Sequence, residues 1–138
     1  MPFTAHCNLI GYVPLKRKNI PHMGAVVGAS ARYFLSGLIA RNFSAIFPYG
    51  TLLINVTGSL VLGFFLVYST ERVLLDPRWR LLLAVGFCGS YTTFSSYAFE
   101  SFALMEQGQW WLMTINIVGS NLLCLAAVLA GAALARGL

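Results

Sequence analysis

The sequence predicts an all-α membrane protein with four transmembrane helices per subunit, and three observations lead to this fold class. Of the 138 residues, 58% are hydrophobic and only 9% are charged, and the mean hydropathy is +0.75. Soluble domains usually carry about 25% charged residues, so this chain has too few to cover a water-facing surface. The apolar residues also form four long stretches, and most of the charged residues lie between them.

Each stretch is close to the roughly 20 residues that an α-helix needs to cross the hydrocarbon layer of a bilayer. The connections hold Arg41, a run of charges from Glu71 to Arg80, and Glu106. The predicted spans are residues 23–40, 49–70, 81–104 and 110–135. A chain of this length forms one compact domain, so we expect residues 21–138 to form a single transmembrane domain.

Residues 1–20 are less apolar than the rest of the chain, and we interpret them as an N-terminal leader that is disordered or non-native. Lys16, Arg17 and Lys18 before an apolar run are typical of a signal peptide. Arg32 interrupts that run, however, and no convincing small-x-small cleavage site is present. The first span is therefore predicted to be retained, and a native start at Met23 stays open as an alternative.

The net charge of +5 indicates a membrane orientation rather than nucleic-acid binding, because of where the charges lie. Four spans place both termini and the 71–80 connection on one side, where the basic residues gather, whereas the other side holds Arg41. By the positive-inside rule the basic side faces the cytoplasm, so we expect a multi-pass protein of the cell inner (plasma) membrane. The basic residues on that side are Lys16, Arg17, Lys18, Arg72, Arg78, Arg80 and Arg136.

Two spans carry a face of small and polar residues, which is how helices contact one another in lipid. Asn55 lies in the middle of the face on the second span, and two interpretations stay open: it serves a functional site, or it only holds two helices together. In the fourth span Asn116, Gly119 and Ser120 share one face. The face on the second span consists of Thr51, Asn55, Gly58, Ser59, Leu62 and Gly63.

The stretch GFCGSYTTFSSYAFE, residues 86–100, departs most from an ordinary membrane helix. It has no aliphatic side chain between Gly86 and Ser96, and Gly, Ser and Thr are weak helix formers. We therefore predict that the third helix is broken in mid-membrane. Backbone groups freed at that depth are tolerated only where protein, water or an ion satisfies them. Phe94 and Tyr97 then project from one face just after the break.

Arg32 and Glu100 are ionisable residues inside predicted spans, where charges are costly and usually face the protein interior. We interpret both as structural charges that pair with residues of other helices or of another chain. Cys88 and Cys124 lie in spans without metal-type spacing and are interpreted as small apolar fillers. The sequence holds no nucleophile–base–carboxylate set, so no enzymatic activity is predicted.

Three pieces of the sequence, in this order and at this spacing, resemble the small fluoride channels of the Fluc or CrcB family. They are GASAR at 28–32, PYGTLLINVTGSLVLG at 48–63 and GFCGSYTTFSSYAFE at 86–100, and the likeness covers about residues 24–131. The resemblance implies a dual-topology homodimer of two antiparallel subunits in the lipid bilayer. Fluoride would leave the cytoplasm passively through two pathways at the subunit interface, which would give fluoride resistance.

The resemblance also implies which residues line each fluoride pathway. Asn55 lines it from the second span, and the ring edges of Phe94 and Tyr97 contact the anion. Phenylalanine is usual at the second ring position, so Tyr97 adds a hydroxyl. In the fourth span Asn116 replaces a usual tyrosine, which leaves selectivity and rate open. The polar track beside the rings would comprise Thr93, Ser95, Ser96 and Ser120.

A central structural sodium ion is also implied by the resemblance, at the break in the third span. Backbone carbonyls of both subunits would hold it, and the matching residues are Gly89 and Thr92. The strong charge bias does not suit a dual-topology dimer, which needs both orientations in the membrane. Either the leader is non-native, which we favour, or this chain is one subunit of a heterodimeric fluoride channel.

A small four-span multidrug or cation transporter is the nearest alternative. Such a transporter needs a carboxylate in its first span to exchange protons for cationic drugs, whereas the first span here has Arg32 and no acid. An accessory protein without transport activity would explain the four helices and the small-residue faces. It would not explain the broken span or Asn55, so the sequence favours the channel.

Overall fold

The computed structural model describes residues 19–43, 46–73 and 75–138, and these residues form helices and connections with no β-strand among them. The fold class predicted from composition is therefore confirmed as all-helical for the described part of the chain. The leader predicted for residues 1–20 lies outside the described residues, except for its last two positions.

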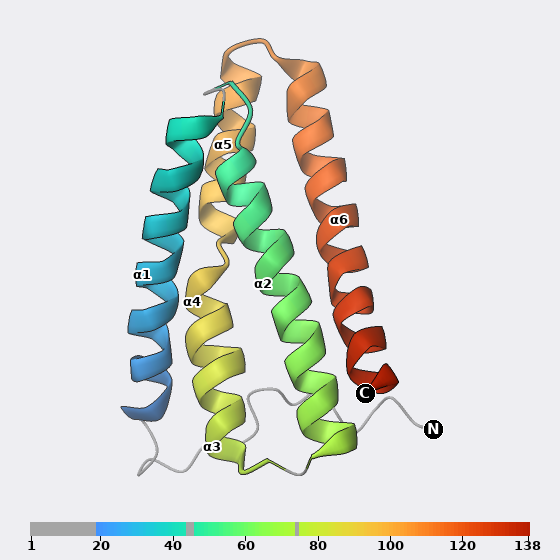
Figure 1. The fold of residues 1–138 in the computed structure, drawn as a ribbon. Coiled ribbons are helices and arrows are strands. Elements are labelled where there is room, and N and C mark those ends of the chain that lie inside the picture. The colour runs from blue at the N-terminus through green and yellow to red at the C-terminus, as the bar shows by residue number, and fades with distance from the viewer. Residues whose placement is uncertain (1–18, 44–45, 74) are drawn as a thin grey trace.

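Three long helices and a series of short ones make up the bundle in Figure 1. The long helices are α1 (Asn19–Asn42), α2 (Tyr49–Val67) and α6 (Trp110–Gly137). The helix α2 continues into a π-helical turn, η3 (Tyr68–Arg72). The chain then returns along the bundle through α3 (Pro77–Arg80), the π-helical η4 (Leu81–Cys88), α4 (Gly89–Tyr91) and α5 (Phe94–Glu106).

Among the residues that the structure describes, three helical segments are long and apolar enough to cross a membrane, and they agree with the first, second and fourth predicted spans. They are Pro21–Asn42, Tyr49–Glu71 and Trp110–Gly137. The predicted third span, residues 81–104, is divided among η4, α4 and α5. That these short helices together form a fourth span stays a prediction.

The helices approach one another closely where glycines lie at their contacts. The helix α2 packs mainly along α6, and α1 packs along η4 and α4. A Cβ atom on Gly63 of α2 would collide with the carbonyl oxygen of Val128 in α6, and one on Gly131 would collide with that of Leu60. Contacts of this kind are typical of helices in lipid. Gly63, one residue of the small-residue face predicted for the second span, therefore lies at a helix contact.

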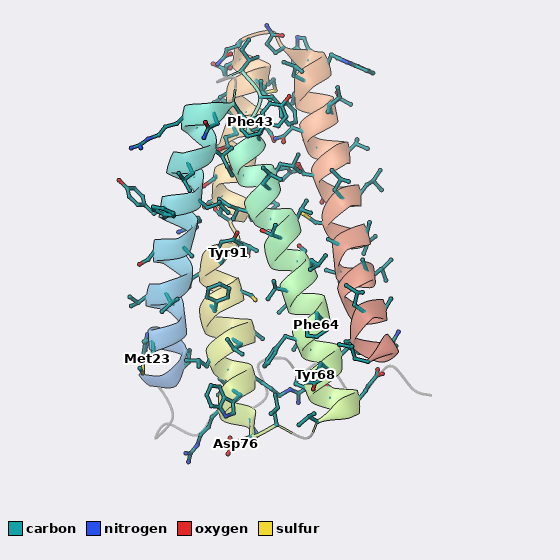
Figure 2. All side chains as sticks on the ribbon, viewed as in Figure 1. Met23, Phe43, Phe64, Tyr68, Asp76 and Tyr91 are labelled. Atoms are coloured by element: carbon teal, nitrogen blue, oxygen red, sulfur yellow. The ribbon has the colours of Figure 1, made fainter. Side chains whose placement is uncertain are left out.

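Different segments of the chain lie at the two ends of the bundle. The start of α1, the connection from α2 to α3 and the end of α6 lie together at one end, and the α5–α6 connection lies at the other (Figure 1). Figure 2 shows side chains projecting outward from α1 and α6. Met23, Tyr33 and Phe34 of α1 and Trp111 of α6 are among the exposed ones. These outer faces suit contact with lipid or with a second chain.

Candidate functional site: a pocket at a helix interruption

The chain leaves the helical conformation at two residues between α4 and α5. Thr92 has φ −75° and ψ 158°, and Thr93 has φ −148° and ψ 117°, so both are extended. The helix α4 ends at Tyr91, and α5 begins at Phe94. Figure 1 shows this interruption about halfway along the bundle, and the labelled Tyr91 marks its level in Figure 2. Its depth within a membrane stays a prediction.

The hydroxyl of Thr93 starts the helix that follows the interruption. Thr93 is the N-cap of α5, and its Oγ1 accepts a hydrogen bond from the backbone N–H of Ser96 at 3.2 Å. Threonine is favoured at this position because its oxygen satisfies an N–H that has no partner within the helix. The hydroxyls of Ser95 and Ser96 lie 3.2 and 3.1 Å from the same oxygen. These three hydroxyls therefore form one local cluster at the start of α5.

Asn55 of α2 pairs with the backbone of Thr93 through both ends of its amide. Its Nδ2 donates to the Thr93 carbonyl at 3.0 Å, and its Oδ1 accepts from the Thr93 N–H at 2.8 Å. Two strand residues exchange hydrogen bonds in the same way in an antiparallel sheet. A buried backbone group without a partner costs about 1–3 kcal/mol, so this pairing stabilises the extended conformation. One amide hydrogen of Asn55 is left over for another partner.

An open pocket of about 260 Å³ lies beside this pairing and is lined by α2, α5, α6 and the extended residues. It brings together most of the pathway residues predicted from the resemblance. Asn121 and Cys124 were not predicted as site residues. An amide in an apolar span is costly without a partner, which could have singled out Asn121, whereas Cys124 carries no such signal. The lining consists of Asn55, Ser59, Leu62, Thr92, Thr93, Phe94, Tyr97, Ser120, Asn121 and Cys124.

Two aromatic rings of α5 line the pocket. Phe94 is 77% exposed, and Tyr97 is half-buried. The ring centroids are 5.5 Å apart, and the ring planes make an angle of 49°. The edge of an aromatic ring carries partial positive charge, and its face carries partial negative charge. A tilted pair of this kind can therefore offer ring edges to an anion in the pocket.

Asn116 lies outside the pocket lining, buried between α5 and α6. Its Nδ2 donates to the hydroxyl of Ser101 at 2.9 Å, and its Oδ1 accepts from the hydroxyl of Ser120 at 3.2 Å. The Ser101 hydroxyl in turn donates to the carbonyl of Tyr97 at 2.8 Å. Asn116 and Ser101 therefore connect the Ser120 hydroxyl to the backbone carbonyl of Tyr97. A direct contact of Asn116 with an ion stays a prediction.

The two ionisable residues of the predicted spans differ in their contacts. Glu100 of α5 accepts a hydrogen bond from the Thr51 hydroxyl of α2 at 2.7 Å, and its Oε2 has no hydrogen-bond partner among the described residues. Arg32 is half-exposed on α1, with neither a hydrogen bond nor an ion pair to the described part of the chain. Glu100 is thus paired with another helix through a hydrogen bond. The structural pairing expected for Arg32 stays a prediction.

The interruption also frees backbone oxygens. Among residues 19–43, 46–73 and 75–138, no hydrogen bond reaches the carbonyl of Thr92, which lies between α4 and α5. Unwound backbone carbonyls of this kind bind Na⁺ in transporters with broken helices. That Gly89 and Thr92 hold the implied sodium ion stays a prediction. Side chains of His, Cys, Asp and Glu form no metal-binding group of three or more within the described ranges.

The chain is similar to known proteins over most of its length. A family model described as "CrcB-like protein, Camphor Resistance (CrcB)" matches residues 20–132. A protein of Koribacter versatilis named "Fluoride-specific ion channel FluC" is 60% identical over 116 residues, which are 84% of this chain and 92% of that protein. Proteins of the same name from Solibacter usitatus and Trichormus variabilis are 44% identical over 114 residues and 45% identical over 115 residues. These cover 83% of this chain in both cases, and 93% and 84% of the relatives.

We predict that Asn55→Leu weakens the backbone structure at the interruption. The Thr93 N–H loses its acceptor, so its hydrogen exchange should become roughly tenfold faster, in line with the contribution of one hydrogen bond. Hydrogen–deuterium exchange read by NMR at this amide is the measurement. Ser59→Ala, one turn further along the same face, is the matched control and should leave the rate unchanged. Equal exchange rates in Asn55→Leu and the wild type would show that the pairing does not hold this segment.

Proposed function

The chain belongs to the CrcB-like protein family, and from this premise we propose that it is a fluoride-selective ion channel. It would let fluoride leave the cytoplasm passively and so protect the cell against fluoride. The pocket at the helix interruption carries the proposal, because it gathers an amide, hydroxyls and ring edges around one open space. The names of the relatives from three organisms agree with this function.

The chemistry of the pocket suits a small anion that holds its water tightly. Removing water from fluoride costs more than removing it from chloride, so the pocket must supply several replacement donors. Asn55 keeps one amide hydrogen beyond its pairing with Thr93, and the Ser59 hydroxyl has no hydrogen-bond partner among the described residues. Ring edges of Phe94 and Tyr97 add weaker donors. Weak donors replace the hydration shell without binding the ion too tightly for it to leave.

The polar residues around the pocket would extend the pathway along α5 and α6. Thr93, Ser95 and Ser96 form the hydroxyl cluster at the start of α5, and Ser120 lines the pocket from α6. The hydroxyl of Ser120 donates a hydrogen bond of 3.2 Å to Oδ1 of Asn116, which keeps this hydroxyl in place. We assign these residues to the polar track of the channel.

A second, antiparallel copy of the chain would complete the site. The pocket is open, and the Phe94 ring at its edge is 77% exposed although it adjoins polar backbone. A second subunit would cover this ring and narrow the pocket. A sodium ion held by the carbonyls of Gly89 and Thr92 from both copies would supply a fixed positive charge at the interruption. Such a charge would offset the cost of placing an anion in the membrane.

Ion flux from liposomes tests the proposed function directly. The purified full chain is reconstituted into liposomes loaded with fluoride and chloride, and ion-selective electrodes follow the loss of each halide. We expect rapid loss of fluoride while chloride is retained, because the donors offset dehydration only for an anion that fits between them. Equal loss of the two halides, or fluoride loss no faster than from protein-free liposomes, would refute the proposal.

The Phe94 ring is predicted to be essential for this flux. Phe94→Ile keeps an apolar side chain but removes the ring edge, and donors preorganised toward an anion contribute on the order of a hundredfold to rates. We expect fluoride efflux to fall by a similar factor, while size-exclusion chromatography shows the same assembly as for the wild type.

Phe99→Ile is the matched control for this variant. Phe99 lies on the same helix, is 70% exposed and is not part of the pocket lining, so its replacement should leave the efflux close to the wild-type rate. Wild-type efflux in Phe94→Ile would remove the ring from the pathway.

A further inference from the structure

We propose that the Tyr97 hydroxyl is an additional hydrogen-bond donor to fluoride in this channel, and that Asn121 of α6 orients it. This inference rests on the proposed function. It gives a role to a hydroxyl that the phenylalanine usual in the family does not have, and to a residue that the resemblance did not assign. Both residues line the pocket beside Asn55 and Phe94.

The orientation of the Asn121 amide is determined by its own helix. Its nitrogen Nδ2 lies 2.6 Å from the carbonyl oxygen of Ile117, one turn earlier in α6. A carbonyl oxygen can only accept, so the amide group facing it must be the NH₂ and not the oxygen. The same Nδ2 lies 2.9 Å from the Tyr97 hydroxyl oxygen. The two hydrogens of the amide nitrogen can therefore serve these two acceptors.

The contact with Asn121 determines whether the Tyr97 hydroxyl donates or accepts a hydrogen bond there. A phenol has one hydrogen to donate and also accepts hydrogen bonds through its oxygen. Because the Asn121 amide donates, the oxygen of Tyr97 accepts, and its own hydrogen is left over. In the part of the chain that the structure describes, no other group is hydrogen-bonded to this hydroxyl. The hydrogen is thus available to an anion in the pocket that Tyr97 lines.

A hydroxyl donor at this position should change how tightly fluoride binds. It should not change the route that fluoride takes through the channel. A hydrogen bond to an ion is about twice as strong as one between neutral groups. The ring edge of Tyr97 remains when the hydroxyl is removed, since phenylalanine has the same ring. The hydroxyl should therefore lower the fluoride concentration that half-saturates the channel, and Asn121 should matter only while the hydroxyl is present.

The test compares Tyr97→Phe, Asn121→Leu and the double variant in the full-length protein. Fluoride efflux from liposomes is measured over a range of fluoride concentrations, and fluoride binding to the purified protein is measured by titration calorimetry. For Tyr97→Phe we expect the half-saturating concentration and the dissociation constant to rise on the order of tenfold, the size of one hydrogen bond to an ion. Asn121→Leu should raise both by a smaller factor. In the double variant, Asn121→Leu should change the half-saturating concentration and the dissociation constant of Tyr97→Phe by no more than about twofold. The reason is that an interaction lost once cannot be lost again.

Tyr91→Phe is the matched control, because the Tyr91 hydroxyl contacts the Thr57 hydroxyl at 2.9 Å and does not line the pocket. It should leave both constants unchanged. The inference is overturned if Tyr97→Phe binds and conducts fluoride like the wild type, or if Asn121→Leu has its full effect in the Tyr97→Phe background. In either case selective fluoride efflux through the wild type would leave the proposed function standing. If the wild type itself fails to pass fluoride, both proposals fall.

Discussion

The pairing of the Asn55 amide with the Thr93 backbone is the interaction on which the rest of the site depends. Within lipid every backbone N–H and carbonyl needs a partner, and an extended segment leaves some of them without one. Asn55 supplies both missing partners for Thr93 from the neighbouring helix α2. Since Thr93 is also the N-cap of α5, the pairing sets where that helix begins. The position of the Phe94 ring, one residue later, follows from it.

The first turn of α5 is held from a second side by α6. The carbonyl of Tyr97 accepts from Ser101, whose hydroxyl is bonded to Asn116, and the hydroxyl of Tyr97 accepts from Asn121. Both ends of this residue are thus connected to α6, while Thr93 is connected to α2. A site fixed from two helices adapts poorly to an ion of the wrong size. Such rigidity would help the proposed channel to discriminate between fluoride and chloride.

The sequence allowed the helices to be placed but not the contacts between them. Apolar length predicted three helices that, in the described part of the chain, are long and apolar enough to cross a membrane. Thr92 and Thr93 are extended within the stretch that lacks aliphatic side chains, and a break of the third span at mid-membrane depth stays a prediction. Helical periodicity placed Asn55 on a contact face, but it does not say what the opposite residue is. That partner depends on how closely α2 packs against its neighbours, and a Cβ atom on Gly58 of α2 would collide with the side chain of Thr92, next to Thr93. Asn116 and Asn121 lie on one helix, yet packing buries the first and turns the second toward the pocket.

Solid-state NMR of the full chain in lipid bilayers tests the central claim most directly. Backbone chemical shifts report whether a residue is helical or extended, and a labelled Asn55 amide reports its distance to the Thr93 carbonyl. The structure predicts extended shifts at Thr92 and Thr93, helical shifts at Tyr91 and Phe94, and a close contact between Asn55 and Thr93. Helical shifts through all four residues, without that contact, would contradict the claim that Asn55 holds an interrupted helix open beside the pocket.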